Sequence, residues 1–475
     1  MWFSPWRRIL RGRSGDAKPS GLRAGTKFVE EDTGVEYTYD PVMQNWKKRV
    51  EPYSAIVCKD GSTVWAEDAS GKTIASGESG VDDASVIQSA IDSIGSNRGK
   101  IYISSGIYYI SNTIEIKVTN GAYPYLSILG AGGIKFGGGT ELIPLNDLPN
   151  GLLKISGDTS TRIVSIHVSD LAINFKEGTY SGISINLEYV SQVNFTRVAV
   201  SGVKGSALQA YSAWDSSFLN CIFYDSRDST NTKPMIELTG STAPNDCENV
   251  RFINCDFVNN KYVVIGATYA AATKLIACKI HGDTINTYKG VTWDEHSSFT
   301  IEGCMFVAVS PAIDEYSGWN VIVGNYFSAG IDNCITLRSD HNTVVGNNML
   351  HGGDDRGIYV IGQYNIIESN NVKGYPRGVD VAGNYNIVGG NILRDGNYGI
   401  YETGDYNTFE GNKCIGNTSA DYNITGSHTY CDEYLYTSLP TDGFAAVNKP
   451  IHYYDGASYY LAVRDGSTWR KVQIS

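Results

Sequence analysis

Four asparagine-containing segments recur every 21 to 23 residues in the second half of the chain, and this short period constrains the fold most. They read HNTVVGNNML from His341, YNIIESNNVK from Tyr364, YNIVGGNILR from Tyr385 and YNTFEGNKCI from Tyr406. With WNVIVGNYF one step earlier, they define two columns: Asn320, Asn342, Asn365, Asn386 and Asn407, and Asn325, Asn347, Asn370, Asn391 and Asn412. Such a period, with short β-branched runs between Gly and Asn, predicts an all-β solenoid.

Each column is expected to become a line of neighbouring side chains. Successive turns of a solenoid stack their strands about 4.8 Å apart. Asparagine suits such a line because it tolerates the left-handed backbone of a sharp corner and because its amide both donates and accepts. We therefore expect two hydrogen-bonded asparagine ladders; the alternative is that these are solvated turn residues.

The second column continues towards the N-terminus with other residue types. Its members there are Cys304, Cys278, Cys255, Cys221, Val198 and Leu171. The exchange of amide for thiol and then aliphatic side chain indicates an enclosed position, where Cys behaves as a small hydrophobe. A straight column does not offer the tetrahedral convergence of a zinc site, so no metal site is expected. Nine cysteines, mostly in interior columns and not in close pairs, also predict no disulfide framework.

The chain divides into four segments by pattern. Residues 1–24 form an N-terminal docking arm, 25–80 a small β module, 81–430 the solenoid and 431–475 a C-terminal β meander. A helix is expected at the start of the solenoid, with Asp82 or Asp83 at its N-cap and its last turn ending at Gly95. A helix in this position would cover the exposed strand edges of the first turn.

Composition limits the partners of the chain. A net charge of −12 argues against nucleic acid, because phosphate binding needs a basic surface, but it says little about glycans. No run of 18 apolar residues is present, so no transmembrane helix is expected. The segment MWFSPWRRILRGRSG lacks the continuous apolar region of a secretory signal and is interpreted as a docking segment for a larger assembly.

The segments DDASVIQSAIDSI, GKIYISSGIYYISNTIEI and LSILGAGG resemble the opening of pectate-lyase-superfamily right-handed parallel β-helix proteins, including polysaccharide-processing tailspikes of tailed viruses. The resemblance implies a right-handed coil, a homotrimer, a virion or extracellular location, other virion proteins as partners of residues 1–24, and a host cell-surface polysaccharide as ligand. It does not imply one chemistry, because this architecture carries lyases, hydrolases, epimerases and binders. Calcium is expected only if the chain is a lyase. The family's catalytic motifs do not occur at matching positions, so no catalytic residue is carried over.

Candidate site residues come from the strand that precedes the first asparagine column. Its outward side chains are expected to be Glu237, Val264, Thr292, Asp314, Thr336, Tyr359, Asp380 and Tyr401. The end of this strand gives the catalytic candidates Asp294, Glu295, Asp314, Glu315, Arg338 and Asp340, while the substrate-binding candidates are Trp293, Tyr359, Asp380, Tyr401 and Glu237.

The spacing of these acids suits glycoside chemistry. Carboxylates on adjacent turns would lie about 5 Å apart and those two turns apart about 10 Å, which brackets retaining and inverting glycosidases. Close like charges would raise one pKa and so provide an acid and a base. Arg338 can instead neutralise a uronate or a lyase intermediate. The alternative is that these are solvated corner residues in ordinary ion pairs.

A further column is aromatic and has two interpretations; its members are Trp319, His341, Tyr364, Tyr385 and Tyr406. These rings can stack on sugars, but their regular register favours a structural corner ladder. The sequence thus predicts a virion-associated, tailspike-like protein that recognises, and in one version depolymerises, a host surface polysaccharide. The alternatives are a non-catalytic spike or adhesin and a secreted pectate-lyase-like enzyme or glycosidase. Whether the chain is an enzyme, a polysaccharide lyase or glycoside hydrolase, stays open.

Overall fold

The computed structural model describes most of the coil and shorter pieces of both ends. The described residues are 9–12, 16–20, 26–30, 36–40, 45–48, 53–95, 97–117, 125–132, 139–159, 161–176, 179–225, 233–260, 263–282, 289–294, 296–328, 333–350, 355–427, 429–431, 435–436, 450–454, 459–465 and 468–474. No helix among them is long and apolar enough to cross a membrane.

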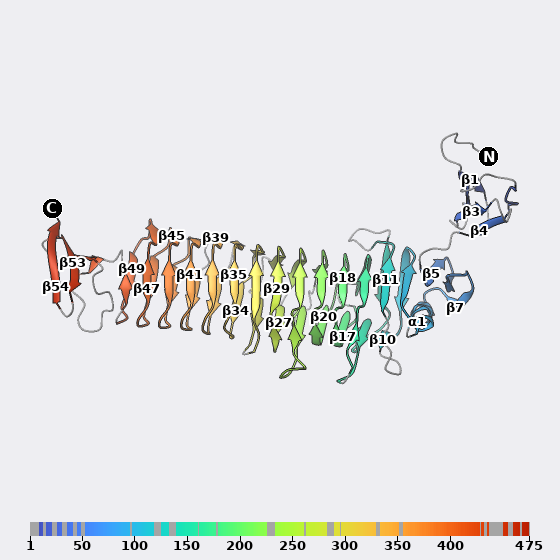
Figure 1. Cartoon of the computed structure of the whole chain (residues 1–475), viewed down its shortest axis with the longest axis horizontal. Coiled ribbons are helices and arrows are strands. Elements are labelled where there is room, and N and C mark those ends of the chain that lie inside the picture. The colour runs from blue at the N-terminus through green and yellow to red at the C-terminus, as the bar shows by residue number, and fades with distance from the viewer. Residues whose placement is uncertain are drawn as a thin grey trace.

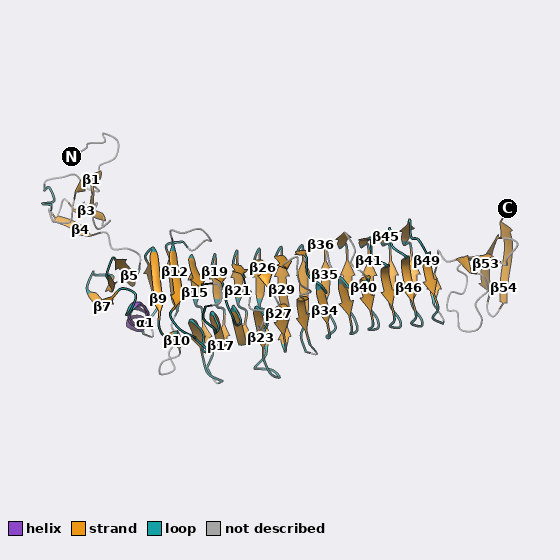
Figure 2. Ribbon diagram, turned by 180° about the vertical axis from the view of Figure 1, so that it is seen from behind, coloured by secondary structure: helices purple, strands orange, loops and turns teal. Residues whose placement is uncertain are grey.

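The chain winds into a long coil whose successive turns build three parallel sheets (Figures 1 and 2). Sheet 1 contains β8 (Gly99–Ile103), β11 (Leu126–Gly130), β15 (His167–Ser169), β18 (Asn194–Thr196), β21 (Ser217–Leu219), β25 (Arg251–Ile253), β29 (Thr273–Ile276), β32 (Phe299–Glu302), β35 (Val321–Val323), β38 (Thr343–Val345), β41 (Ile366–Glu368), β44 (Ile387–Gly389), β47 (Thr408–Glu410) and β50 (Tyr430–Cys431). Each strand pairs with its counterpart one turn away, which confirms the predicted solenoid.

The other two sheets follow the same order. Sheet 2 contains β9 (Gly106–Ile110), β12 (Thr140–Pro144), β16 (Leu171–Asn174), β19 (Ala199–Ser201), β22 (Ile222–Tyr224), β26 (Asp256–Asn260), β30 (Lys279–Gly282), β33 (Met305–Val307), β36 (Tyr326–Ser328), β39 (Asn348–Leu350), β42 (Asn371–Lys373), β45 (Ile392–Arg394) and β48 (Lys413–Ile415). Sheet 3 contains β10 (Ile114–Lys117), β13 (Leu153–Ser156), β17 (Ile185–Ser191), β20 (Leu208–Trp214), β23 (Ile236–Thr239), β27 (Val263–Ala267), β31 (Lys289–Trp293), β34 (Ile313–Glu315), β37 (Ile335–Leu337), β40 (Arg356–Val360), β43 (Arg377–Val381), β46 (Tyr398–Glu402) and β49 (Ala420–Ile424). The short strands β14 (Ile163–Val164), β24 (Cys247–Glu248) and β28 (Ala270–Ala271) flank sheet 3.

The core fills the inside of the coil with side chains stacked from turn to turn. Phe218 lies between Phe195 and Phe252, with ring centroids 5.1 and 4.9 Å away and the planes nearly parallel. The cysteine column Cys221, Cys255, Cys278 and Cys304 is buried, at most 1% exposed, which confirms that the position is enclosed. All nine cysteines are free thiols.

The two asparagine columns form the predicted ladders. All ten side chains are at most 2% exposed. In the first ladder the Nδ2 to Oδ1 distances between successive members are 2.7, 2.9, 3.1 and 3.2 Å, and in the second they are 2.9, 3.0, 3.0 and 2.9 Å. Each Oδ1 also accepts from the backbone N–H of the previous member, as Asn365 does from Asn342 at 2.8 Å. The ladders therefore satisfy polar groups at two buried corners of the coil.

One expectation about these corners was wrong. The left-handed backbone belongs to the residue before each asparagine and not to the asparagine itself. At the first corner this residue is Trp319, His341, Tyr364, Tyr385 or Tyr406, with φ between 56° and 66°. At the second corner it is glycine in four turns, including Gly324 and Gly346, and Ser369 in another. Asparagine is thus placed here by its amide hydrogen bonds.

The N-terminal end of the coil is closed by α1 (Asp83–Ile94) and by β5 (Ala55–Asp60), β6 (Thr63–Asp68) and β7 (Thr73–Glu78). Strand β5 extends sheet 1 by pairing with β8. The side-chain amide of Gln88 donates to the backbone carbonyl of Glu115 in β10 and accepts from the backbone N–H of the same residue. The Asp83 carboxylate accepts from the backbone N–H of Tyr109 in β9 at 2.7 Å. The helix therefore pairs with the first strands of sheets 2 and 3, as a cover over strand edges should.

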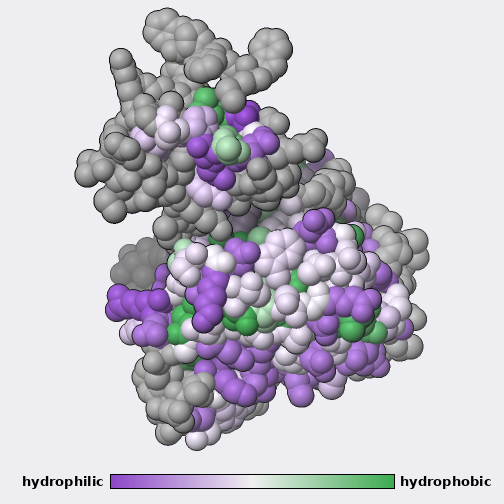
Figure 3. All heavy atoms as spheres, turned by 90° about the vertical axis from the view of Figure 1, so that its right-hand side faces the viewer, coloured by the Kyte–Doolittle hydropathy of each residue, from purple (hydrophilic) through white to green (hydrophobic). Residues whose placement is uncertain are grey.

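The details of this cover differ from a standard N-cap. The Asp82 side chain makes no capping bond to the helix, and it accepts instead from the backbone N–H of Glu78 at 2.8 Å. Asp83 is fully buried and pairs with Lys59 Nζ at 2.7 Å. Seen from this end, the described surface is mostly hydrophilic or pale, with hydrophobic colour confined to small areas (Figure 3). Val86, Ile87, Ala90, Ile91 and Ile94 of α1 are buried in the core, so the apolar face of the helix is turned towards the coil.

Both chain ends carry small sheets. Near the N-terminus, β1 (Ile9–Gly12) pairs in parallel with β2 (Lys27–Glu30), which continues antiparallel to β3 (Glu36–Asp40) and β4 (Asn45–Lys48). The predicted module 25–80 therefore contains strands of two different sheets. Near the C-terminus, β51 (Leu435–Tyr436) pairs with β52 (Pro450–Tyr454), and β53 (Tyr459–Asp465) and β54 (Thr468–Ile474) complete an antiparallel meander.

Candidate functional site

Sheet 3 presents a polar outward column that runs through consecutive turns. The register of the strands aligns Glu115, Lys154, Asn186, Gln209, Glu237, Gly266, Thr292, Asp314, Thr336, Tyr359, Asp380, Tyr401 and Asn423. The prediction was wrong at one member, because Ile236 pairs with Ile265 and Glu237 therefore lies beside Gly266. Val264, expected in this column, is fully buried.

A hollow of about 350 Å³ opens on sheet 3 around Gly266. Its walls are Pro234, Glu237, Thr239, Gly266, Ala267, Thr268, Thr292, Trp293, Asp294 and Tyr316. Gly266 has no side chain between Glu237 and Thr292, and a Cβ built on it would lie 2.5 Å from Pro234 Cγ. The glycine therefore lets Pro234 close against the strand while leaving a gap in the outward column.

Two residues at the wall of this hollow each carry a buried polar atom without a hydrogen-bond partner among the described residues. They are Trp293, with its indole Nε1, and Asp294, with Oδ1. Trp293 is only 2% exposed, and its ring stacks on Phe299 with centroids 4.4 Å apart. Since Trp293 is in register with Glu315, its side chain lies inside the coil, and neither atom is open to a ligand in the hollow.

Asp314, a predicted catalytic residue, is held in ion pairs. Its Oδ1 accepts from Nε of Arg338 at 2.8 Å, and its Oδ2 accepts from Nζ of Lys289 at the same distance. The carboxylate is 1% exposed, and the Arg338 guanidinium lies 4.6 Å from the centroid of the Tyr316 ring. Both carboxylate oxygens are therefore engaged by cations in this state.

Glu315, predicted beside Asp314 in the groove, lies inside the coil and is fully buried. Its carboxylate accepts from the Ser339 hydroxyl at 2.6 Å and from Nδ2 of Asn342 at 3.0 Å. Burial raises the pKa of Glu315 to about 7, partly offset by hydrogen bonds from the hydroxyl and backbone N–H of Ser339. The structure therefore does not bring Glu315 and Asp314 to one face, because consecutive residues of a strand point to opposite sides.

The remaining predicted residues are spread along the sheet. Asp340 accepts from the backbone N–H of Gln363 at 2.6 Å. Asp380 is 2% exposed and pairs with Arg356 and Arg377, whose guanidinium groups lie 4.2 and 4.0 Å from the Tyr359 and Tyr401 rings respectively. Glu237 lies in the hollow, where it accepts from Gln209 Nε2 at 3.1 Å. Glu295 lies outside the described residues.

Of the predicted set, the hollow thus collects Glu237, Trp293 and Asp294, while Tyr359, Asp380 and Tyr401 form a second group several turns away. Sequence reasoning missed Gly266 and Pro234. It placed Tyr316 at the end of its strand, directly after Glu315, but did not include it among the candidates. Gly266 could be found only with the correct register of β23 and β27.

The exposed aromatic column is a structural ladder. From Trp319 to Tyr406 the ring centroids are 4.5, 5.3, 5.3 and 4.9 Å apart, and the planes are within 21° of parallel. Each inner ring has both faces covered by its neighbours, so mainly edges meet the solvent. This arrangement leaves no inner ring face for a sugar.

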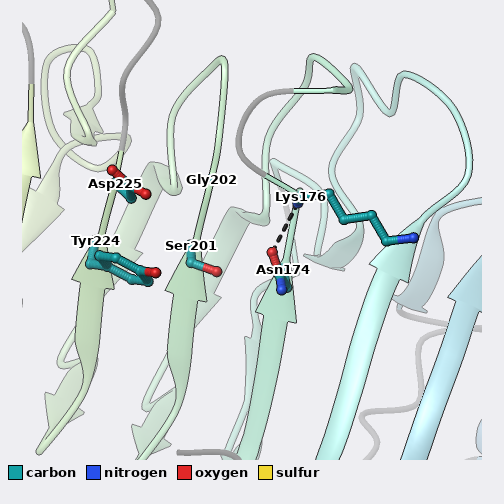
Figure 4. Close-up of a pocket in the computed structure, with 6 residues that line it drawn as sticks. All are labelled: Asn174, Lys176, Ser201, Gly202, Tyr224 and Asp225. Carbon is teal, nitrogen blue, oxygen red and sulfur yellow. Dashed lines mark hydrogen bonds between the residues drawn. The ribbon is translucent and has the colours of Figure 1, made fainter. Parts of the chain in front are cut away.

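A second hollow, of about 390 Å³, lies at the ends of β16, β19 and β22 in sheet 2 (Figure 4). Asn174, Ser201 and Tyr224 form one wall, and Lys176, Gly202 and Asp225 lie on the loops that follow. The Asn174 side chain is engaged locally, since Oδ1 accepts from the backbone N–H of Lys176 at 2.8 Å and Nδ2 donates to Glu141 at 2.7 Å. It belongs to a different sheet from the predicted groove.

A calcium ion would be expected only if the chain were a lyase, and it would need several oxygen ligands in one place. Within the part of the chain that the structure describes, no three His, Cys, Asp or Glu side chains converge on a metal position. The described residues therefore do not fit a calcium ion.

Comparisons with solved structures return matches at low identity. ORF18 of Geobacillus virus E2 is 15% identical, with 99% of this chain and 84% of that chain covered and a TM-score of 0.40. PfbA, a surface adhesin of Streptococcus pneumoniae, is 14% identical over 84% and 96% of the two chains, with a TM-score of 0.43. DFA-IIIase from Arthrobacter chlorophenolicus A6 is 16% identical over 60% and 80%, also with a TM-score of 0.43.

Among the curated proteins no match was found. The family described as the right handed beta helix region matches this sequence over residues 181–348 and 269–418, which together make half of the chain. Its sequence pattern and the three stacked parallel sheets agree, and the chain belongs to the right-handed β-helix family.

Proposed function

We propose that the chain recognises a surface glycan along the outward face of sheet 3, with the hollow around Gly266 as its central subsite. The observation that carries this proposal is the hollow itself, about 350 Å³ in volume, which brings Glu237 together with the exposed ring of Tyr316. The hollow also combines polar and aromatic side chains, a mixture typical of sites for sugars, which have apolar faces and hydroxyl edges.

Recognition without cleavage is the primary form of this proposal. The acids predicted as catalytic are engaged elsewhere: Asp314 and Asp380 each pair with two cations, and Glu315 lies inside the coil. A rigid coil that presents a groove, with its acids used for structure, fits a spike or adhesin. Location on a virion, trimer formation and docking through residues 1–24 belong to the same proposal and rest on the resemblance of the opening segment.

Glycoside hydrolysis is the second candidate, because two carboxylates line the same hollow. Glu237 lies in β23, and Asp294 follows β31 two turns away and two residues further along the strand direction, so their Cα atoms are roughly 12 Å apart by the strand spacing and rise. The carboxyl groups of inverting glycosidases are about 6.5–9.5 Å apart, so this pair matches them only when both side chains lean towards the sugar. In that mechanism one carboxyl group protonates the leaving oxygen while the other activates a water molecule.

The test uses the purified full chain and an array of bacterial and plant surface polysaccharides. Binding is measured on immobilised glycans, and cleavage is measured by release of reducing ends and of unsaturated uronate products. Binding that is lost in the Asp294→Ala variant and kept in an Asp395→Asn variant, which changes an exposed acid of another sheet, supports the proposal. Absence of binding to every glycan would refute it. Reducing-end release that requires Glu237 and Asp294 would establish the hydrolase.

Assembly is tested separately. Sedimentation equilibrium of the full chain should show a trimer, and a monomer at all concentrations would remove that part of the proposal. Such a result does not bear on the sheet 3 subsite, which the binding experiment tests.

A further inference from the structure

We propose that Tyr316 and Trp319 form a platform of two aromatic rings on which a neutral oligosaccharide stacks as it crosses from sheet 3 to sheet 1. The inference rests on the proposed glycan recognition and specifies the kind of sugar and the rings that contact it. Both residues belong to the segment that connects β34 with β35, so a single turn of the coil carries the platform.

Trp319 is the free end of the aromatic ladder. It is 74% exposed, whereas the three tyrosines further along the ladder are 42–49% exposed. His341 of the next turn covers one face of the indole, with the ring centroids 4.5 Å apart. The other face is therefore turned towards the preceding turn of the coil.

The preceding turn offers no ring to that face. Continuing the register of β32 and β35 by two residues places Ser298 beside Trp319, and a serine is too small to cover an indole. Its hydroxyl is engaged locally, accepting from the backbone N–H of Ala272 at 2.8 Å. His296, the exposed ring of the same turn, stacks on Tyr269 instead, with centroids 4.6 Å apart. The open face of Trp319 is thus available to a ligand.

Tyr316 is oriented in the same way. Arg338, which follows its counterpart strand on the next turn, places its guanidinium 4.6 Å from the centroid of the Tyr316 ring. The opposite face points towards the preceding turn, where the ring lines the hollow around Gly266 and is 44% exposed. In both residues, therefore, the face towards the C-terminal end of the coil is covered and the face towards the N-terminal end is open.

This arrangement suits consecutive units of a sugar chain. A pyranose carries C–H groups on its face and hydroxyl groups at its rim, so it stacks on an aromatic face while its rim stays hydrogen-bonded. Tyr316 and Trp319 are three residues apart, which separates their Cα atoms by at most about 10 Å. The two rings can therefore contact neighbouring units of one chain. Glu237, Thr239 and Thr292 of the hollow offer polar groups to the hydroxyls of the unit at Tyr316.

The charge beside the platform favours neutral units. Two of the ten residues that line the hollow, Glu237 and Asp294, are acidic, and none is Lys, Arg or His. Arg338 lies against the covered face of Tyr316 and is paired with Asp314. A uronate or sulfate group stacked at Tyr316 would meet like charge without a compensating cation, and such juxtaposed charges act against a ligand.

The experiment measures the binding of four trisaccharides to the full chain by calorimetry, saturation-transfer NMR and tryptophan fluorescence. The probes are the β-linked trimers of glucose, of galactose and of mannose, and trigalacturonate. At least one neutral trimer should bind about tenfold or more tightly than trigalacturonate. Saturation transfer should be strongest for the protons on one face of the pyranose ring. Covering the exposed indole should shift tryptophan emission to shorter wavelength.

Variants of Trp319 separate ring stacking from general apolar contact. Trp319→Leu keeps apolar bulk without a flat ring and should weaken binding of that neutral trimer about tenfold or more, as the loss of an aromatic anchor does. Trp319→Phe retains a ring, so it should keep most of the binding and lose the emission shift. Equal thermal midpoints of the wild type and both variants verify that folded proteins are compared.

Tyr316 has a matched control elsewhere in the coil. Tyr316→Ala should also weaken the neutral trimer about tenfold or more. Tyr125→Ala removes another exposed tyrosine, 40% exposed, whose ring centroid lies 4.6 Å from the guanidinium of Arg98. This control should bind as the wild type does, because Tyr125 has no second open ring on its turn.

The outcomes separate the two proposals. Binding that is unchanged in Trp319→Leu and Tyr316→Ala, or equally weakened in Tyr125→Ala, would overturn the platform and leave glycan recognition standing. Trigalacturonate binding as tightly as the neutral trimers would overturn the preference for neutral sugars, as would failure of every neutral trimer when a glycan of the array binds. Failure of the protein to bind any member of the full glycan array would instead refute the proposed function.

Discussion

The buried carboxylate of Glu402 accepts a hydrogen bond of 2.9 Å from Nδ2 of Asn407, at the last rung of the first asparagine ladder. Every earlier member of this ladder donates to the next asparagine, but Asn407 has no asparagine beyond it. Glu402 also accepts from the Thr429 hydroxyl at 2.8 Å and from the backbone N–H of Gly426 at 3.0 Å. The acid thus terminates the ladder and joins it to the final turn.

Removing this acid should loosen the C-terminal end of the coil. In Glu402→Ala, two buried donors and the part-buried N–H of Gly426 lose an acceptor, and each unpaired buried donor costs about 1–3 kcal/mol. We expect a loss of roughly 3 kcal/mol, concentrated in the last turns because solenoid stability is the sum of local turns and interfaces. Hydrogen exchange should show loss of protection in residues 405–431 with little change before residue 300. Uniform loss along the whole coil would contradict the terminator role.

Glu315 should make the stability of the coil depend on pH. Burial raises its folded-state pKa to about 7, above the ordinary value of 4.5, so the folded protein holds a proton that the unfolded chain has released. Stability from this group is present below pH 4.5 and is lost as the pH rises from about 4.5 to 7, by up to about 3 kcal/mol. Chemical denaturation at several pH values measures it.

The Glu315→Gln variant isolates this contribution. Glutamine keeps the shape of the protonated acid and an oxygen for the Asn342 amide, but it cannot ionise. The variant should be more stable than the wild type at pH 8 and should show a flatter dependence between pH 5 and 7. Burial also raises the pKa of Glu402, which is present in both proteins and therefore cancels. A parallel pH dependence in wild type and variant would exclude Glu315 as the source.

Periodicity was enough to predict the coil, both asparagine ladders and the enclosed cysteine column, because aligned positions of a solenoid are spatial neighbours by construction. Periodicity failed at β27, because Val263, Val264 and Ile265 are all buried. Without alternating polar and apolar residues, the sequence does not show which side chains of this strand point outward. The hollow was missed for the same reason, since it depends on Gly266 lying beside Glu237. Local register in an uninterrupted apolar run is set by packing, which a single sequence does not display.

The ion pairs around the acidic residues could not be predicted from the sequence either. Alternation placed Asp314 outward, but it could not show that Lys289 from the previous turn and Arg338 from the next would enclose it. Both cations come from loops or strand ends about 25 residues away. Spacing identifies which turns are adjacent, while the reach of long side chains across turns depends on their rotamers.

The junction between the amide and thiol columns offers a test of ladder energetics. Within the described part of the chain, Asn325 Oδ1 accepts only from the backbone N–H of Cys304, at 2.8 Å, whereas Asn370 Oδ1 accepts from both the N–H and the Nδ2 of Asn347. A cysteine at position 325 would extend the thiol column by one turn and leave one buried donor weakly paired. Asn370→Cys would leave two, so it should destabilise by about 1–2 kcal/mol more. Equal denaturation midpoints for the two variants would show that ladder continuity contributes little.

Asp314 distinguishes a structural ion-pair centre from a catalytic one. In Asp314→Asn, Lys289 and Arg338 lose their charge partner, and because both are about two-fifths exposed they can turn to water. We therefore expect a loss of roughly 1 kcal/mol in unfolding free energy, with glycan binding at the Gly266 hollow within about twofold of wild type. The matched change Asp294→Asn, which alters the carboxylate in the hollow, should weaken binding with little effect on stability. If Asp314→Asn abolished binding or cleavage while the fold stayed intact, the ion pairs would have to open for function, and the site would centre on Asp314 instead.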